Sequence, residues 1–167
     1  GATNSAVVHG GFDPARKAHA RSKDDHFVLA HTGHLYPEQP WGRFFGALRR
    51  LVLDHPHLAA LLKVRFVGAT SSEPRLLKEL EETRISTCVI DRVPTVDRET
   101  ALQLQEDSDA LLQLALSGKK GYLPVKFLEY LGARRPIVLF SQEEDEMEEI
   151  IASTRAGTVL RDEHELL

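Results

Sequence analysis

Lys126 and Glu129 are the two residues whose types and spacing point most directly to chemistry. Residues three positions apart share one face of a helix, so a cation and a carboxylate would be presented side by side. A carboxylate can accept hydrogen bonds from hydroxyl groups, and a lysine can offset the negative charge of a phosphate. The alternative is an ordinary solvated ion pair without a function, and the two residues alone favour that alternative.

The stretch 121–138 contains the helix that must position this pair. Pro124 suits the first helical turn, where its missing N–H costs nothing, and Gly132 with Pro136 beyond it predicts the end of the helix. About two turns remain between these residues. Three apolar residues recur at helical spacing and should face the core: Val125, Leu128 and Leu131.

The residues before this helix predict an anion site. An apolar run at 109–114 is short enough for a buried strand, and the loop Ser117-Gly-Lys-Lys-Gly121 follows it. The first backbone N–H groups of a helix lack intrahelical partners and lie at the positive end of its dipole, so a phosphate is favoured there. Positive charge would be added by Lys119, Lys120 and Lys126.

Strands and helices alternate along most of the chain. We expect strands at 27–31, 64–68, 86–90, 109–114, 136–140 and 157–160. We expect helices at 40–54, 58–62, 73–82, 98–106, from Pro124 onward, and at 143–153. This alternation predicts an α/β fold with parallel β-α-β units and right-handed crossovers, that is, a doubly wound, Rossmann-like sheet with helices on both faces. In the first helix, the buried residues should be Trp41, Phe44, Leu48 and Leu51.

Doubly wound sheets bind ligands at the carboxyl ends of their strands, near the point where the strand order reverses. The loops 32–40, 91–96, 115–123 and 141–144 all follow predicted strands. They should therefore share one edge of the sheet, and the helix face with Lys126 and Glu129 should open onto that edge.

The run Leu123-Pro-Val-Lys-Phe-Leu-Glu-Tyr-Leu-Gly-Ala-Arg-Arg-Pro-Ile-Val138 resembles a signature of retaining, GT-B type glycosyltransferases. That signature reads P-x-K-x-x-E-Y-L-x-x-x-x-P-I/V-V and lies in their nucleotide-binding half. The resemblance implies that Glu129 holds the ribose hydroxyls of a nucleotide-sugar and that Lys126 lies near the diphosphate. Many members carry a second glutamate eight residues earlier, close to the donor sugar, and the residue at that position here is Gly121.

Three further segments are similar to the same family. The segment Val8–Pro14 is similar to V-x-N-G-V-D-P, which crosses between the two domains, so this chain would start at the hinge. Gly33-His-Leu-Tyr36 is similar to the loop, often G-R-L or G-T-L-Y-G, that passes under the donor phosphates. It matches the glycine and the Leu-Tyr, and His34 stands in place of the customary arginine of G-R-L. Here backbone N–H groups, with a protonated His34, would bind phosphate. The loop at Arg92-Val-Pro94 corresponds to the one that lines the nucleobase.

The resemblance thus implies the donor-binding C-terminal domain of a hexosyltransferase-like enzyme of carbohydrate biosynthesis. Residues 1–25 would be a linker or hinge segment and 26–167 the domain that binds a UDP- or GDP-sugar, without an obligatory cofactor. A separate N-terminal domain would bind the acceptor, and any peripheral membrane association would come through that domain. Lys126 and Glu129 would take part in catalysis. The donor would be bound by Gly33, His34, Arg92, Val93, Pro94, Gly121, Leu123, Pro124, Lys126 and Glu129.

Composition limits the other classes. A net charge of −4 argues against a nucleic-acid binder, which would show a basic excess. The single cysteine, Cys88, cannot form an intrachain disulfide and suits a reducing cytoplasm. The pairs His31 with His34 and His55 with His57 each lack an obvious third ligand, so we expect no metal site. The acidic run 143–149 should be a solvated face at the start of a helix.

Two alternatives stay open. The first is a non-enzymatic regulatory domain of similar architecture, such as a response-regulator-like fold. That fold needs an acidic cluster after its first strand, where this chain has His31-Thr-Gly33. The second is a scaffold in which the nucleotide site has degenerated, which His34 and Gly121 would support.

Overall fold

The computed structural model describes residues 11, 25–68, 78, 90–118, 121–143 and 145–162 of the 167-residue chain. Several sequence predictions fall outside these residues. They are most of the hinge segment 1–25, the helix 73–82 apart from Lys78, the strand 86–90 apart from Ile90, Cys88, and the lysines Lys119 and Lys120.

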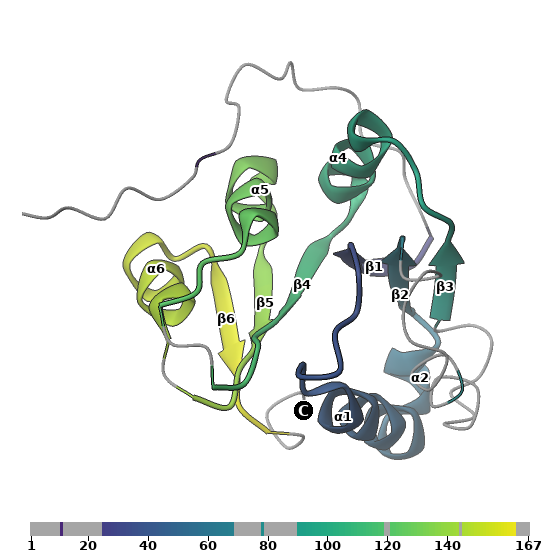
Figure 1. Ribbon diagram of the computed structural model, residues 1–167. Helices are drawn as coiled ribbons and strands as arrows, with labels where there is room; N and C mark the ends of the chain where they lie inside the picture. Colours follow the sequence, from purple (N-terminus) through teal and green to yellow (C-terminus); the bar gives the residue numbers. More distant parts are fainter. Residues whose placement is uncertain are drawn as a thin grey trace, which may run out of the picture.

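The described part of the chain forms one six-stranded sheet in which all the strands are parallel (Figure 1). Its strands are β1 (Phe27–Thr32), β2 (Leu62–Val67), β3 (Ile90–Val93), β4 (Ala110–Leu114), β5 (Ile137–Phe140) and β6 (Gly157–Leu160). Their order is β3-β2-β1-β4-β5-β6, so the order reverses between β1 and β4. The predicted doubly wound sheet is confirmed.

Helices cover both faces of the sheet. They are α1 (Trp41–Asp54), α2 (Pro56–Ala59), α4 (Arg98–Asp107), α5 (Val125–Ala133) and α6 (Glu146–Thr154). The helices α1 and α2 lie on one face, and α4, α5 and α6 lie on the other (Figure 1). None of the helices in the described residues is long and apolar enough to cross a bilayer.

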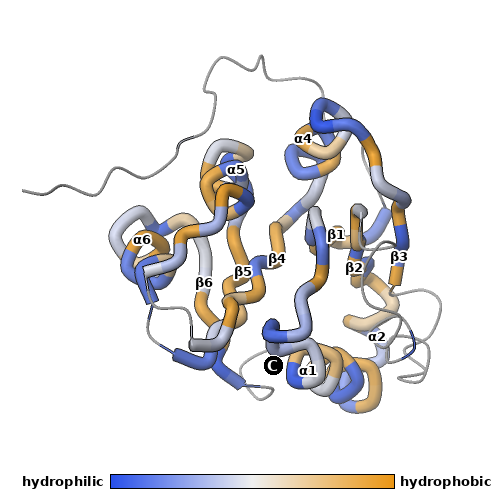
Figure 2. Tube along the Cα trace, viewed as in Figure 1, coloured by the Kyte–Doolittle hydropathy of each residue, from blue (hydrophilic) through white to orange (hydrophobic). Residues whose placement is uncertain are grey.

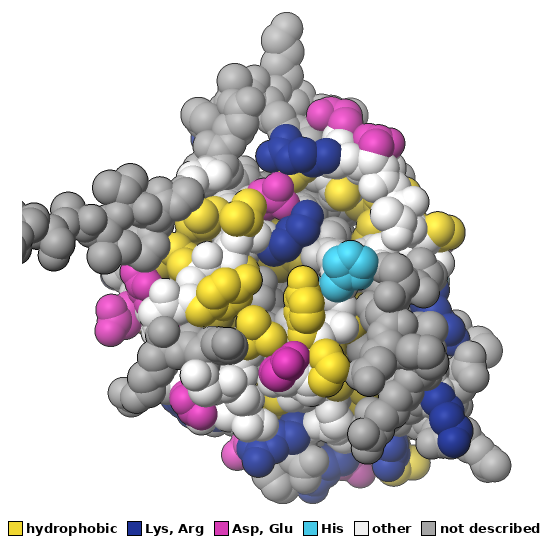
Figure 3. Space-filling view, viewed as in Figure 1, with side chains coloured by type: hydrophobic (Ala, Val, Ile, Leu, Met, Phe, Trp, Pro, Cys, Tyr) yellow, Lys and Arg dark blue, Asp and Glu magenta, His cyan; other side chains and the backbone are white. Residues whose placement is uncertain are grey.

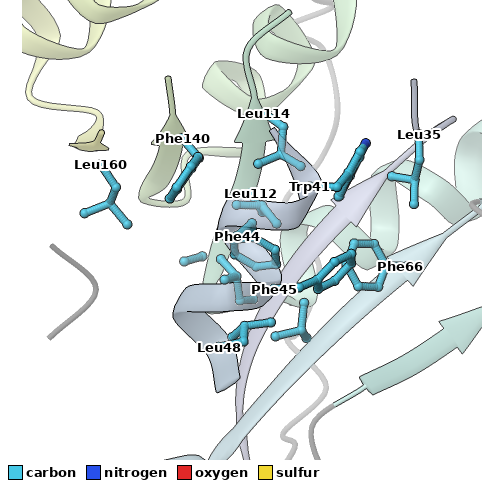
Figure 4. Close-up of a cluster of buried hydrophobic side chains, with 13 residues drawn as sticks. Leu35, Trp41, Phe44, Phe45, Leu48, Phe66, Leu112, Leu114, Phe140 and Leu160 are labelled. Atoms are coloured by element: carbon cyan, nitrogen blue, oxygen red, sulfur yellow. The ribbon is translucent and has the colours of Figure 1, made fainter. Parts of the chain in front are cut away.

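A separate hydrophobic cluster packs on each face. The strands β4 and β5 are mostly hydrophobic along their length (Figure 2), as expected for parallel strands that are buried on both faces. The cluster against α1 is rich in aromatic rings and includes the predicted Trp41, Phe44 and Leu48 (Figure 4). The cluster on the other face joins β4 and β5 to α5 and α6 through Phe127, Tyr130, Met147 and Ile151. Leu51 is also buried, as predicted.

The second helix and the third strand differ from their predicted bounds. The helix expected at 58–62 spans Pro56–Ala59, because Pro56 opens it. Leu62 already belongs to β2, where it pairs with Phe27. Arg92 and Val93, expected in a loop, form the end of β3 and pair with Phe66 and Val67.

The helix α5 also corrects three expectations. Pro124 is its N-cap and not a residue of its first turn. Gly132 does not end the helix, which runs to Ala133 and ends at Arg134 with a left-handed φ of 55°. Val125 is 64% exposed, because the first residue of α5 lies at the carboxyl edge of the sheet, beyond the strands that would cover it.

Candidate functional site

The loops that follow β1, β3 and β4 meet at the carboxyl edge of the sheet, beside the reversal of strand order between β1 and β4. A space-filling view shows basic, acidic and histidine side chains near the centre of the face seen in Figure 1, with hydrophobic side chains around them (Figure 3). This edge is where the sequence predicts the site.

Glu129 is the centre of a cluster of charges at this edge. Its side chain is 7% exposed, and its Oε2 accepts a hydrogen bond from Lys126 Nζ at 3.0 Å. Arg98 Nη2 donates to Oε1 at 3.4 Å. A carboxylate that is removed from water needs such partners, since an unpaired buried charge is very costly. We call these three residues the Glu129 cluster.

The burial of Glu129 argues against the simplest alternative interpretation of the sequence, an ordinary solvated ion pair. Lys126 and Arg98 keep their charged ends partly in solvent, with side chains 41% and 66% exposed. The carboxylate between them is buried. The two cations are therefore accessible from solvent, whereas the acceptor between them is covered.

Gly33 brings backbone close to this cluster. A Cβ atom built on Gly33 would lie 3.7 Å from Lys126 Cε, so the lysine stem passes directly over the loop that follows β1. The φ of Gly33 is 118°, which strains any residue with a side chain. Its N–H donates to the Val67 carbonyl at 2.8 Å. The start of the loop is thereby anchored on β2.

The loops after β2 and β3 approach the same point. A Cβ on Gly68 would lie 4.0 Å from the backbone of Gly33 and 3.9 Å from Thr95 Oγ1. Gly68 also has a positive φ, of 78°. Backbone of the loops after β1 and β2 thus lies close together beside Lys126, and Thr95 of the loop after β3 approaches through its side chain.

A buried polar network lies below the Glu129 cluster. Thr32 N–H donates to the Tyr130 hydroxyl at 2.9 Å, and Gln105 Nε2 donates to Thr32 Oγ1 at 2.9 Å. Burial raises the pKa of the Tyr130 hydroxyl from its ordinary value of 10.0 to about 12, so the group stays protonated well into the alkaline range. We call Thr32, Gln105 and Tyr130 the Thr32 network.

The far end of the loop after β1 is tied to β4. Gln39 Nε2 donates to the Leu114 carbonyl at 3.1 Å, and Gln39 Oε1 accepts from the Tyr36 N–H at 2.8 Å. Trp41 Nε1 donates to the Tyr36 carbonyl at 2.9 Å. Both ends of residues 33–40 are therefore held by hydrogen bonds.

His31 lies beneath this loop and is buried. Its Nδ1 is 3.0 Å from the Leu112 carbonyl, and its ring packs edge-on against Trp41 at 5.7 Å. Burial lowers the pKa of His31, which favours a neutral ring that donates from Nδ1. His34 is exposed. No group of three or more His, Cys, Asp or Glu residues that could hold a metal occurs among the residues that the structure describes.

The remaining residues predicted to bind a ligand lie around the same edge. Arg92 and Val93 end β3, and Pro94 after them is exposed. Gly121 is exposed with a φ of 72°, while Leu123 and Pro124 are half-buried before α5. The residues that the structure brings into direct proximity are Gly33, Lys126 and Glu129.

Sequence reasoning missed Arg98 and the Thr32 network. Arg98 opens α4 directly after Asp97, whose Oδ1 caps the helix by accepting from the Thr100 N–H at 2.9 Å. The sequence could have indicated Arg98, because the first residue of a capped helix that follows a strand lies at the carboxyl edge of the sheet. The sequence did not indicate a role for Gln105 or Thr32, since polar residues of these types are common in helices and strands.

Comparisons with known proteins show which fold this is. No family model matches the chain, and no curated protein matches it. Among solved structures, WaaG, a glycosyltransferase involved in lipopolysaccharide biosynthesis, matches with a TM-score of 0.65 and 19% identity, over 86% of this chain and 36% of WaaG. An α,α-trehalose-phosphate synthase from Burkholderia vietnamiensis matches with a TM-score of 0.64 and 12% identity, over 85% of this chain and 36% of the synthase.

A third similar structure is TarM of S. aureus, solved in complex with UDP and other ligands. It matches with a TM-score of 0.61 and 14% identity, over 90% of this chain and 29% of TarM. This chain spans about a third of the length of these proteins. They are GT-B glycosyltransferases, and the fold fits a GT-B C-terminal-like domain. The resemblance of the sequence to this group is confirmed at the level of fold.

Proposed function

We propose that this chain is the donor-binding domain of a glycosyltransferase that moves a sugar from a UDP- or GDP-sugar to an acceptor. The observation that carries the proposal is the buried Glu129 carboxylate, held between two cations and next to the Gly33 backbone at the reversal of strand order. A fixed acceptor beside flexible positive charge suits a ribose linked to a diphosphate.

The ligand would lie along the carboxyl edge of the sheet. The ribose hydroxyls would donate to Glu129, whose oxygens can each accept more than one hydrogen bond. The diphosphate would lie between the Gly33 loop and Lys126, close to the N-terminus of α5, where the positive end of the helix dipole favours an anion. The base would extend toward Arg92-Val-Pro94 at the end of β3.

In sugar transfer, negative charge grows on the diphosphate as the sugar departs. Lys126 would stabilise that charge most strongly when it is greatest, which is the requirement for lowering the barrier. Glu129 would hold the ribose and so fix the position of the leaving group. The acceptor would be supplied by a further domain, because transfer requires donor and acceptor to be held together.

Two of the similar structures support UDP as the first nucleotide to test. The TarM structure contains UDP, and a similar E. coli protein of the trehalose-6-phosphate system was solved with UDP-2-fluoroglucose. The E. coli structure matches with a TM-score of 0.62 and 12% identity, over 85% of this chain and 33% of that protein.

Calorimetry with UDP and GDP tests the proposal. The chain should bind one of them weakly but saturably, because it presents one wall of a cleft. Glu129→Gln should weaken binding about tenfold, since a charge-assisted hydrogen bond becomes a neutral one. Glu149→Gln is the matched control, because it removes the same charge from an exposed position on α6.

The competing hypothesis is a scaffold with a degenerate site. This hypothesis rests on Gly121, which stands where the resembled enzymes carry a glutamate; a Cβ atom built on Gly121 would have no heavy atom within 4 Å. If no nucleoside diphosphate binds saturably at millimolar concentration, the scaffold is favoured. If Glu129→Gln binds like the parent, the ribose role of Glu129 is wrong.

A further inference from the structure

We infer that Tyr130 is a positioning residue: together with Gln105 it fixes Thr32, and thereby sets the backbone of Gly33 against Lys126 and Glu129. The part of this inference that concerns phosphate rests on the proposed function. The part that concerns the backbone of the loop stands on the unliganded protein.

The first observation is the gap between β1 and β4. The register of these strands covers only Leu29 and Ala30, which pair with Ala110 and Leu111. Gly33 N–H points to β2, where it donates to Val67, and successive backbone groups of a strand alternate in direction. Thr32 N–H therefore points to the β4 side, beyond the paired residues. The Tyr130 hydroxyl accepts this N–H in place of a strand carbonyl.

The second observation is the convergence of three elements on Thr32. Tyr130 comes from α5, where it follows Glu129 directly. Gln105 comes from α4, whose first residue, Arg98, contacts Glu129. Thr32 itself precedes Gly33, over which Lys126 lies. The Thr32 network thus joins β1, α4 and α5, the elements that carry the proposed site, directly beneath that site.

The third observation is the cost in stability of burying the Thr32 network. Tyr130, Gln105 and Thr32 are at most 1% exposed. Within the described residues, Gln105 Oε1 has no hydrogen-bond partner, and a buried polar atom of this kind lowers stability. Apolar residues would pack this region without that cost. We therefore infer that the main effect of the Thr32 network is to hold the start of the loop after β1 in place, and that its contribution to stability is smaller.

Tyr130→Phe tests the inference because it removes only the hydroxyl. In the unliganded protein, the backbone amide signal of Gly33 should shift in a ¹H–¹⁵N spectrum, and the Thr32 amide should exchange with solvent faster. In titrations with uridine and with UDP, the variant should keep the affinity for uridine. Its affinity for UDP should fall about tenfold, the equivalent of one lost hydrogen bond.

Four further variants separate positioning from simple loss of stability. Tyr122→Phe removes an exposed tyrosine hydroxyl and should change neither readout. Ile151→Val lowers stability in the α6 part of the core, away from Thr32, and should leave the ratio of UDP to uridine affinity unchanged. Thr32→Ser keeps the acceptor for Gln105 and should retain that ratio, whereas Thr32→Val removes the acceptor and should lower it.

The outcomes distinguish this inference from the proposed function. If Tyr130→Phe weakens uridine and UDP equally, or leaves the Gly33 amide signal and the affinity ratio unchanged, Tyr130 has only a structural role and the inference is overturned. If the parent chain binds neither UDP nor GDP, the proposed function fails. The Gly33 and Thr32 amide measurements then decide the positioning role by themselves.

Discussion

The two faces of the sheet are built from different chemistry. Against α1, aromatic rings pack on one another, with Trp41 stacked on Phe45 at 6.0 Å and Phe44 edge-on to Phe140 at 6.2 Å. Toward α4 and α5, the core contains the Thr32 network and lies next to the buried Glu129 carboxylate. Both faces are closed to solvent. The polar contacts of the second face join β1 to α4 and α5 beneath the Glu129 cluster, whereas on the first face His31 and Trp41 bond to backbone carbonyls of β4 and of the loop after β1.

This difference separates stability from the proposed binding. Apolar packing is non-directional and tolerates small displacements, whereas a hydrogen-bonded network holds specific atoms in place. The α1 face contributes burial of large aromatic surfaces. The α5 face gives up some of that burial and holds Gly33, Lys126 and Glu129 in fixed relation. Changes on the two faces should therefore affect different measurements.

The largest effect should come from Phe44→Ala on the α1 face. The ring is fully buried, so its removal should lower the free energy of unfolding by about 3–5 kcal/mol, from lost burial and the cavity left behind. Urea denaturation measures this change. Leu53→Ala, at a side chain that is 72% exposed, is the control and should have little effect. UDP affinity per folded molecule should stay the same for both variants, and a specific loss of affinity in Phe44→Ala would contradict the separation of the two faces.

The next effect should appear at high pH on the α5 face. The pKa of Tyr130 is raised to about 12, so between pH 10 and 12 the unfolded chain loses a proton that the folded chain keeps. The free energy of unfolding should therefore fall as pH rises through this window, by about 2–3 kcal/mol from this group. Tyr130→Phe should remove that part of the loss, while Tyr122→Phe should keep it. An unchanged alkaline limb in Tyr130→Phe would show that the hydroxyl is not protected as described.

A smaller loss of stability, in the opposite pH direction, should appear in acid on the α1 face. Burial lowers the pKa of His31, so below about pH 6.5 the unfolded chain binds a proton that the folded chain does not. The free energy of unfolding should fall as pH decreases, with a slope of at most about 1.4 kcal/mol per pH unit from this residue. His31→Gln should flatten the profile. His57→Gln, at an exposed position, should not, and equal profiles for the two variants would contradict the burial of His31.

The smallest effect should come from Arg98→Ala. The guanidinium is mostly exposed and its contact with Glu129 is long, so its loss should weaken UDP binding only about two- to fivefold. The effect should shrink at high salt. Arg49→Ala, at an exposed position on α1, is the charge-matched control for calorimetry. A loss as large as that in Glu129→Gln would mean that Arg98 itself binds the diphosphate.

Local sequence patterns were enough to predict the fold and part of the site. The alternation of apolar strands with helices predicted a parallel sheet, since the periods of the two elements differ and short connections limit the topology. The spacing of Lys126 and Glu129 was enough to pair them, because the geometry of a helix brings such residues together whatever surrounds them. The position of Gly33 after a strand predicted its place at the carboxyl edge.

Only the tertiary structure decided how the rest of the site is built. Arg98 meets Glu129 across 31 positions, and Tyr130 meets Thr32 across 98, so both contacts depend on which strands are neighbours and on how the helices pack over them. Burial of Glu129 and exposure of Val125 reversed the expectation from their polarity, because the burial of a helix position depends on the elements that pack around it and not on its own residue type. The local sequence determined which elements form. Packing between distant elements determined which side chains meet.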